Sequence, residues 1–199
     1  MTVIRLGNSG LLVHSPTRAD AATKAALAEL GPVDSIMAPT WWHDLFLGEW
    51  VAAYPAAKLY GEKDLIAYHR RLPFQPPLND RPSPWPEIDL LPVDGMWLFL
   101  NEIVTLHKPS RTAIIADLAF YLSETRPASI KRWFRFVGGY PGCRFPVIYR
   151  PAVRNRAQLR KEIERVLAWD FDRLILGHGD VIETEGKTAL RHAFAWLLG

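Results

Sequence analysis

The sequence predicts an α/β sandwich with mixed sheets, and three observations lead to this class. Short apolar runs rich in β-favouring residues recur along the 199 residues, bounded by glycine or proline. Amphipathic helical stretches lie between many of these runs, which is the pattern of alternating strands and helices. The same order of elements occurs in each half of the chain, so we expect two sheets with helices packed against them.

The length and composition indicate one globular domain. Hydrophobic residues make up 49% of the chain and charged residues 23%, which suits a folded protein and excludes a disordered one. We therefore treat residues 1–199 as a single domain. No apolar run approaches the roughly 18 residues of a membrane-spanning helix. Residues 1–10 lack the apolar core of a secretory signal, and we expect no membrane partner.

The chain contains one cysteine, Cys143. One thiol cannot form an internal disulfide, which fits a reducing compartment and leads us to expect a cytoplasmic protein. It also excludes zinc sites built on cysteine pairs. Any metal must therefore be held by histidine and carboxylate side chains.

The N-terminal half begins with a hairpin signal. Residues 3–6 and 11–14 are apolar, and residues 7–10 between them (Gly-Asn-Ser-Gly) tolerate the positive φ angles of a tight turn. Residues 18–30 carry apolar side chains at helical spacing and end at Gly31-Pro32, which is a helix stop. The remaining elements predicted in this half are a strand at 33–38, a helix at 45–54, a strand at 58–60 and a helix at 63–71.

A proline-rich segment follows, with seven of the sixteen prolines between Pro73 and Pro92. Proline fixes φ and cannot donate to a strand ladder, so we predict a long loop at 73–92 with extended pieces. Phe74 and Trp85 indicate that this loop packs on the protein, and we expect it near the functional site.

The C-terminal half again alternates strands and helices. We predict paired strands at 95–100 and 102–107, and a strand at 112–116 that ends at Asp117. The remaining elements predicted in this half are helices at 127–137 and 155–169, a strand at 173–176 and a helix at 185–198.

Histidine and aspartate side chains stand at the carboxyl ends of several predicted strands. His43-Asp44 follows one strand, His107 and Asp117 end two others, and His178 follows the last one between two glycines. In α/β folds, such strand ends gather ligand-binding residues at one edge of the sheet. Imidazole and carboxylate are suitable ligands for zinc, iron or manganese. These residues therefore predict a metal site.

Four stretches near strand ends form a more specific pattern: Val13-His14-Ser15-Pro16, residues 38–60, HKPSRTAIIADL at 107–118 and ILGHGD at 175–180. In this order they resemble the metallo-β-lactamase superfamily, and more closely its uncharacterised bacterial branch, DUF4336. The resemblance spans nearly the whole chain. It implies a four-layer αββα sandwich of mixed β-sheets, with the site in a groove between the loop edges of the two sheets.

The resemblance also implies roles for single residues. His107 would take the place of the superfamily's third ligand histidine, and His178 that of the last one. Asp117 would match the carboxylate that bridges two metals. His43-Asp44 stands where the superfamily carries its HxHxDH motif, which makes both residues candidate ligands.

The match to the HxHxDH motif is incomplete. With Asp44 on the aspartate of the motif, its three histidine positions hold Thr40, Trp42 and Leu45. Members of DUF4336 tend to have two adjacent histidines where this chain has His43 and Asp44. Asp44, Asp117 and His178 remain as ligands for one metal, with His107 and His43 as possible additions. We therefore expect a mononuclear or weakened metal site in preference to a dinuclear one, and a metal-free protein stays open as an alternative.

The predicted function is that of a metal-dependent hydrolase acting on an ester, thioester, lactone or phosphoester of a small-molecule substrate. A divalent metal, most readily zinc but also iron or manganese, would make hydroxide available as nucleophile. Asp44 could serve as the base. Trp41 and Trp42 either wall a substrate pocket or belong to the core. The alternative is a metal-free pseudoenzyme that binds a small molecule or a polyanion, and a homodimer is also open.

Two other groups of polar residues have plainer interpretations. His14-Ser15 suggests a nucleophile, but the sequence places no third group beside it, so we predict no catalytic triad. His69 lies beside Arg70 and Arg71, and we predict that it is solvated.

Basic residues gather in one part of the chain. Residues 131–165 include ten Lys or Arg residues against two acidic ones. This segment is either a face for phosphates, RNA or an anionic surface, or a solvated helix preceded by an arginine-rich loop. The segment has few aromatic residues of the kind that stack on bases, and we do not expect a nucleic acid partner.

Overall fold

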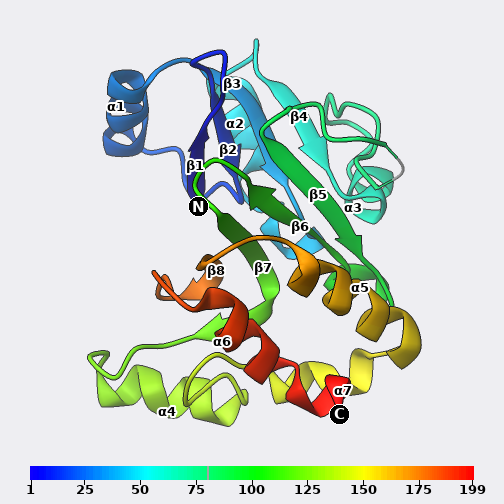
Figure 1. Cartoon of the computed structure of the whole chain (residues 1–199). Helices are drawn as coiled ribbons and strands as arrows, with labels where there is room; N and C mark the ends of the chain where they lie inside the picture. The colour runs from blue at the N-terminus through cyan, green and yellow to red at the C-terminus, as the bar shows by residue number, and fades with distance from the viewer. Residues whose placement is uncertain (80) are drawn as a thin grey trace.

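The computed structural model describes residues 1–79 and 81–199 and contains two four-stranded sheets (Figure 1). In the first sheet, β1 pairs antiparallel with β2, and β2, β3 and β4 run parallel. In the second, β5, β6 and β7 pair antiparallel and β8 lies parallel to β7. The strands are β1 (Thr2–Arg5), β2 (Leu11–His14), β3 (Val33–Ala38), β4 (Lys58–Gly61), β5 (Ile88–Val93), β6 (Glu102–His107), β7 (Thr112–Tyr121) and β8 (Arg173–Gly179). Both sheets are mixed, as predicted.

Most of the helices lie on the outer faces of the sheets, whereas α4 lies below the end of β7 in this view (Figure 1). The α-helices are α1 (Ala21–Leu30), α2 (Leu47–Ala53), α3 (Lys63–Tyr68), α4 (Ala128–Phe136), α5 (Arg156–Ala168), α6 (Gly186–Ala193) and α7 (Ala195–Leu198). Three short 3-10 helices, η1 (Trp41–His43), η2 (Leu98–Leu100) and η3 (Val147–Ala152), lie in connections. The predicted helix at 185–198 is thus divided at Phe194. None of the helices in the described ranges is long and apolar enough to cross a membrane.

Three of the hydrophobic clusters show that the elements form four layers. In β2, Leu11 and Val13 face the helices of the first sheet while Leu12 faces the second sheet. In β7, Ile114 faces the first sheet while Ile115 packs toward α5 and α6. This alternation is the period-two pattern of a strand with both faces buried. The order helix, sheet, sheet, helix is the αββα sandwich that the sequence predicts.

The partner of β6 differs from the predicted one. Residues 95–100 form no strand, because the Gly95 carbonyl accepts hydrogen bonds from Arg154 and Asn155 and the Trp97 N–H donates to Ala152. This segment is thereby tied to η3 and the start of α5.

β5 instead pairs with β6, and all of it except Val93 lies inside the predicted 73–92 loop. It is an edge strand, where Pro92 is tolerated despite its missing N–H. Earlier in the same segment, Leu78 and Trp85 are buried between the two sheets. This part of the proline-rich segment therefore completes the core between the sheets.

Candidate metal centre

Three of the predicted site residues come together where the two sheets meet. One ligand atom from each of His43, Asp117 and His178 lies within 4.8 Å of the others. His43 comes from η1, directly after β3 of the first sheet, whereas Asp117 and His178 come from β7 and β8 of the second. Backbone contacts join the sheets at this place, since the Ile103 N–H donates to the Pro39 carbonyl. We call these three residues the trio.

The backbone of Asp117 is held in place by the carboxylate of Glu102. The Glu102 side chain accepts hydrogen bonds from the backbone N–H groups of Ala116, Asp117 and Leu118, at 2.9, 2.7 and 3.0 Å. Burial, and then repulsion from Asp117, raises the pKa of Glu102 to about 7, against the opposing effect of the three N–H donors. Glu102 thus fixes the irregular part of β7 from which the Asp117 side chain extends.

His178 stands between two glycines because β7 passes very close to it. The pairing of β7 with β8 shifts register between Ile115 and Phe120, and the backbone approaches Gly177 and Gly179. A Cβ on Gly179 would lie 1.6 Å from the Tyr121 carbonyl oxygen, and the φ of Gly179 is +115°. Only glycine fits such a position. The Gly-His-Gly sequence therefore brings the two strands together and directs His178 to Asp117.

The loop after β8 is anchored as well. Asp180 accepts a hydrogen bond from the backbone N–H of Ser123 at 2.9 Å and forms a forked ion pair with Arg126. These contacts hold the pKa of Asp180 well below its usual range, chiefly through Arg126. The segments that follow β7 and β8 are thereby joined on one side of His178.

His43 is oriented by a buried chain of hydrogen bonds. Its Nδ1 lies 2.7 Å from the Ser15 hydroxyl, which lies 3.1 Å from Nδ1 of His14. Ser15 has a φ of +54°, a left-handed conformation that is strained for a residue with a side chain. This conformation puts the hydroxyl between the two rings and leaves Nε2 of His43 facing Asp117.

Burial keeps both of these histidines neutral. It lowers the pKa of His43, and the Asp117 carboxylate opposes this shift only in part. Burial, followed by repulsion from His43, lowers the pKa of His14 to about 3. A neutral imidazole with one free ring nitrogen is the form that binds a metal ion.

The trio has the properties of a cation site. Asp117 Oδ1 lies 2.9 Å from His178 Nε2. Its Oδ2 is buried, lies 3.8 Å from His43 Nε2 and has no hydrogen-bond partner in the part of the chain that the structure describes. A buried carboxylate oxygen without a partner is costly. A cation among these atoms would satisfy that oxygen, and two imidazoles with one carboxylate are a known donor set for zinc and iron. The residues therefore fit a single divalent metal.

His107 does not join the trio, so the structure does not support its predicted role as a ligand. It pairs with Thr112 at the start of β7, five residues before Asp117 and roughly 16 Å along the strand. Its Nδ1 lies 2.7 Å from the Ser110 hydroxyl in the adjoining turn. The prediction fails because β6 runs antiparallel to β7. The carboxyl end of β6, where His107 lies, is therefore beside the start of β7 and away from Asp117.

Asp44 is also outside the trio. Its Oδ2 lies 2.6 Å from Nε2 of His69 at the end of α3. This contact also shows that His69 is not simply solvated, contrary to the prediction. The structure therefore provides no contact that would support Asp44 as a ligand or as a base.

An aromatic cluster adjoins His43. Trp41 lies 4.4 Å from Tyr68 and 6.4 Å from Phe99 between ring centroids, and Trp42 lies 6.2 Å from Phe99. Trp42 is 59% exposed and Tyr68 62% exposed. Trp42 is therefore a surface residue, whereas Trp41 is partly covered by its neighbours.

Sequence reasoning missed two groups that shape this site. The sequence places no third group beside Ser15 and His14, whereas in the structure His43 is that group. Glu102 gave no signal, because its three partners are backbone N–H groups that cannot be read from side-chain identity.

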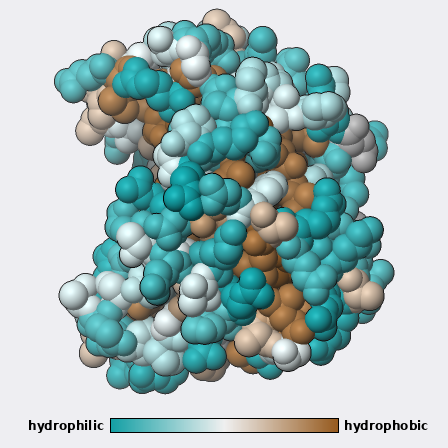
Figure 2. All heavy atoms as spheres, viewed as in Figure 1, coloured by the Kyte–Doolittle hydropathy of each residue, from teal (hydrophilic) through white to brown (hydrophobic). Residues whose placement is uncertain are grey.

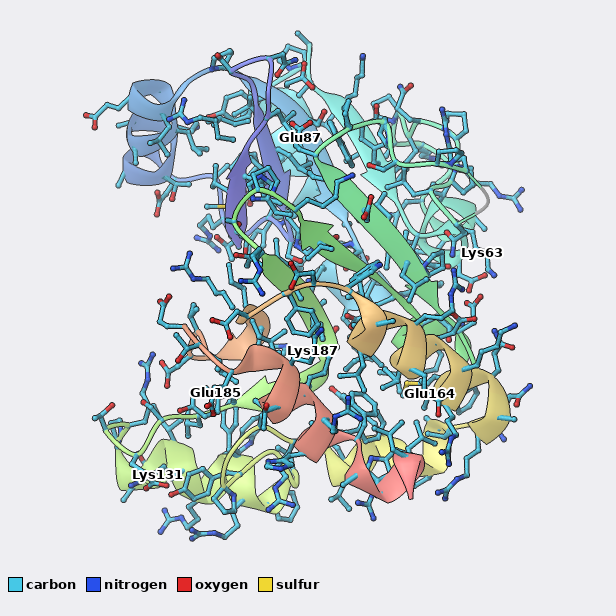
Figure 3. All side chains as sticks on the ribbon, in the orientation of Figure 1. Lys63, Glu87, Lys131, Glu164, Glu185 and Lys187 are labelled. Carbon is cyan, nitrogen blue, oxygen red and sulfur yellow. The ribbon has the colours of Figure 1, made fainter. Side chains whose placement is uncertain are left out.

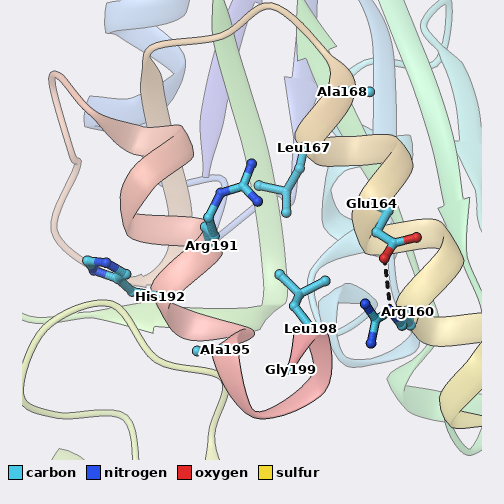
Figure 4. Close-up of a pocket in the computed structure, with 9 residues that line it drawn as sticks. All are labelled: Arg160, Glu164, Leu167, Ala168, Arg191, His192, Ala195, Leu198 and Gly199. Atoms are coloured by element: carbon cyan, nitrogen blue, oxygen red, sulfur yellow. Dashed lines mark hydrogen bonds and ion pairs between the residues drawn. The ribbon is translucent and has the colours of Figure 1, made fainter.

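A groove lies away from the trio, near the C-terminus. A groove of about 580 Å³ runs between α5 and the two C-terminal helices, and the Arg160–Glu164 ion pair lines it (Figure 4). Hydrophobic residues show between these helices in the space-filling view (Figure 2). The groove contains no member of the trio.

Solved structures share this fold. A metallo-β-lactamase from Hirschia baltica is 16% identical with a TM-score of 0.62, over 98% of this chain and 84% of that chain. The apo chemotaxis sensor ODP from T. denticola is 14% identical with a TM-score of 0.65, over 98% and 83%. Rubredoxin oxygen:oxidoreductase from Desulfovibrio gigas is 13% identical with a TM-score of 0.67, over 98% and 52%. The fold is therefore that of the metallo-β-lactamases.

Sequence comparison supports a narrower assignment. A search of curated proteins finds no match. Residues 1–134 match the domain of unknown function DUF4336. This match includes His43 and Asp117 but ends before His178. Because it covers more than half of the chain, the protein belongs to the DUF4336 family.

Proposed function

We propose that this protein is a metal-dependent hydrolase with one divalent metal held by His43, Asp117 and His178. The observation that carries the proposal is the buried Oδ2 of Asp117, which has no hydrogen-bond partner among the described residues and faces Nε2 of His43. Among proteins of this fold, the chemotaxis sensor ODP has been solved with a diiron species. That likeness supports a metal in general. Zinc, iron and manganese all suit the donor set.

When bound, a divalent cation polarises a carbonyl or phosphoryl oxygen and activates water near neutral pH. Residues of the chain hold the metal ligands in position. Ser15 and His14 hold the His43 ring in one orientation, and Glu102 holds Asp117. A half-exposed His178 leaves one side of the trio open to a substrate. Substrates of this site would be esters, thioesters, lactones or phosphoesters.

The aromatic cluster supports a substrate with an apolar group. Trp41 and Trp42 precede His43 directly, so a substrate whose reacting bond lies at the trio can rest its apolar part on these rings. Tyr68 and Phe99 enlarge the same surface. Exposed aromatic side chains beside a polar site are typical of small-molecule binding.

Metal content tests the first part of the proposal. We would purify the wild type and the variants Asp117→Ala and His178→Ala, incubate them with zinc, iron or manganese, and measure bound metal by elemental analysis. His107→Ala is the matched control, since it removes a histidine of the same sheet that lies outside the trio. We expect about one metal per chain in the wild type and in the control, and loss of metal in the other two variants.

The outcome separates two functions on this fold. A wild type that takes up none of the three metals would contradict the proposal and favour a metal-free binding protein. The contact of Asp44 with His69 would then explain why Asp44 is not used as a metal ligand. If metal binds as expected, a screen of aryl esters, lactones and phosphodiesters with the same variants tests the hydrolase activity. Activity that is equal in the wild type and in Asp117→Ala would exclude the trio as its source.

A further inference from the structure

The helix α4 has an apolar side that the protein does not cover. Phe134 attaches the helix to the core, with its ring centroid 5.8 Å from that of Phe120. Trp133 and Phe136, on another side of α4, are 57% and 82% exposed, and Ile130 is also exposed. Three large apolar side chains in one short helix are therefore open to solvent.

The start of η3 extends this surface. The Ile148 N–H donates to the Val137 carbonyl, so η3 begins against the end of α4. Val147 and Ile148 are both half-exposed there. Together these side chains form what we call the α4 patch: Ile130, Trp133, Phe136, Val147 and Ile148. Contiguous exposed apolar surface of this kind marks an interaction site more often than chance exposure.

The chain around the α4 patch is strongly basic. α4 itself carries Lys131, Arg132 and Arg135 and no Asp or Glu. Lys131 lies on α4 (Figure 3) and contacts Glu124, while Arg126 pairs with Asp180. Arg132 is exposed on the same helix and has no acidic partner within the described ranges. Apolar side chains thus project from a surface with excess positive charge.

We propose that the α4 patch docks on the surface of a bilayer that contains anionic phospholipids. Trp and Phe side chains favour the interface between headgroups and acyl chains. Basic residues beside them are attracted to anionic headgroups near the surface. This mode of binding needs no membrane-spanning helix.

Two other partners fit the observations less well. A second copy of the chain would bring two basic patches face to face, and their like charges would repel. A nucleic acid would be attracted by the charge and could stack on Trp133. It would offer nothing to the aliphatic side chains Ile130, Val147 and Ile148, because stacking requires aromatic rings.

Docking would also bring the trio close to the membrane surface. The Phe120 ring, against which α4 packs, lies 4.8 Å from the His178 ring. One aromatic ring therefore separates α4 from the trio. The proposal does not depend on a metal, since the α4 patch and its charge are independent of the three ligands.

Vesicle sedimentation tests the proposal with the full chain. We would compare vesicles of phosphatidylcholine with vesicles that also contain about 30 mol% phosphatidylserine, at low and high salt. We expect binding to the anionic vesicles only, weakened by salt. Phe136→Ala alone and Trp133→Ala with Phe136→Ala should each reduce the partition coefficient, the double variant by about tenfold or more. Leu30→Ala, at an exposed leucine of α1, is the matched control and should bind like the wild type.

Circular dichroism and thermal unfolding would establish that the variants are folded, and the wild type alone already decides the main point. No binding of the wild type to anionic vesicles would overturn the proposal, as would equal binding to neutral ones. Salt-sensitive binding of a mixed RNA pool without vesicle binding would assign the surface to nucleic acid. A wild-type dimer that Phe136→Ala dissociates, again without vesicle binding, would assign it to self-association.

Discussion

At the scale of single residues, Ser15 decides how His43 is presented to a metal. A ring that offers Nε2 to a cation carries its proton on Nδ1, and that proton is donated to the Ser15 hydroxyl. The Ser15 hydroxyl can then donate to Nδ1 of His14. The buried pair of Ser15 and His14 thus accommodates the tautomer of His43 that leaves Nε2 free, and the positive φ of Ser15 puts its hydroxyl between the two rings.

Two substitutions of Ser15 separate the hydroxyl from the backbone strain. Ser15→Ala and Ser15→Gly both remove the hydroxyl, so we expect each to weaken metal affinity by about 10- to 100-fold in isothermal titration calorimetry. Ser15→Gly also relieves the strain at φ +54° and should be the more stable of the two by about 1 kcal/mol in urea unfolding. Unchanged metal affinity in Ser15→Ala would show that Ser15 does not orient His43.

At the scale of elements, the close approach of β7 and β8 determines where His178 lies. The backbone of β7 lies very close to Gly179, and a substitution at Gly179 tests whether this close approach is needed. Gly179 and Gly142 both have positive φ angles, +115° and +71°. A Cβ on Gly179 would collide with the backbone of Tyr121, whereas a Cβ on Gly142 would meet nothing within 4 Å.

We therefore expect unequal effects of the same substitution. Gly142→Ala adds only backbone strain and should lower the free energy of unfolding by about 1 kcal/mol. Gly179→Ala must also separate the two strands, so it should cost several kcal/mol, on the order of the larger single-residue effects, and abolish metal binding. Chemical denaturation of both variants measures the difference. Similar losses in the two variants would mean that β7 and β8 do not need this close contact.

The elements also show where sequence reasoning succeeds and fails. The strands and helices with clear apolar periodicity, such as β3 and α5, lie within two residues of their predicted bounds. The predicted partner of β6 is wrong because Pro92 and the prolines before it indicate a loop where β5 lies. A proline is nevertheless acceptable on an edge strand such as β5. His107 was misplaced for a related reason, since strand direction is a property of pairing and is not visible in one segment alone.

At the scale of the whole molecule, the candidate site joins the two sheets. His43 follows the first sheet, while Asp117 and His178 belong to the second. The sequence points to these three residues because each ends or follows a predicted strand, although β7 continues past Asp117 to Tyr121. It could not show that Asp44 would turn to His69, nor that Glu102 would bind three N–H groups, since both contacts depend on how distant segments fold together.

A metal bound by ligands from both sheets should stabilise the folded chain as a unit. Binding to the folded state alone adds about 2.7 kcal/mol when free metal is at 100 times its dissociation constant. For a chain of this size, each kcal/mol raises the melting temperature by about 2–4 °C. We expect zinc to raise the melting temperature of the wild type and of His107→Ala in scanning calorimetry, and a chelator to reverse the rise.

The variant His43→Ala tests whether the stabilisation crosses the sheets. It leaves Asp117 and His178 in place on the second sheet and removes the one ligand that the first sheet contributes. If the metal links the sheets, this variant should lose most of the zinc-dependent rise although two ligands remain. A rise equal to that of the wild type would show that the second sheet binds the metal alone, and that His43 serves only to fill the space beside Asp117.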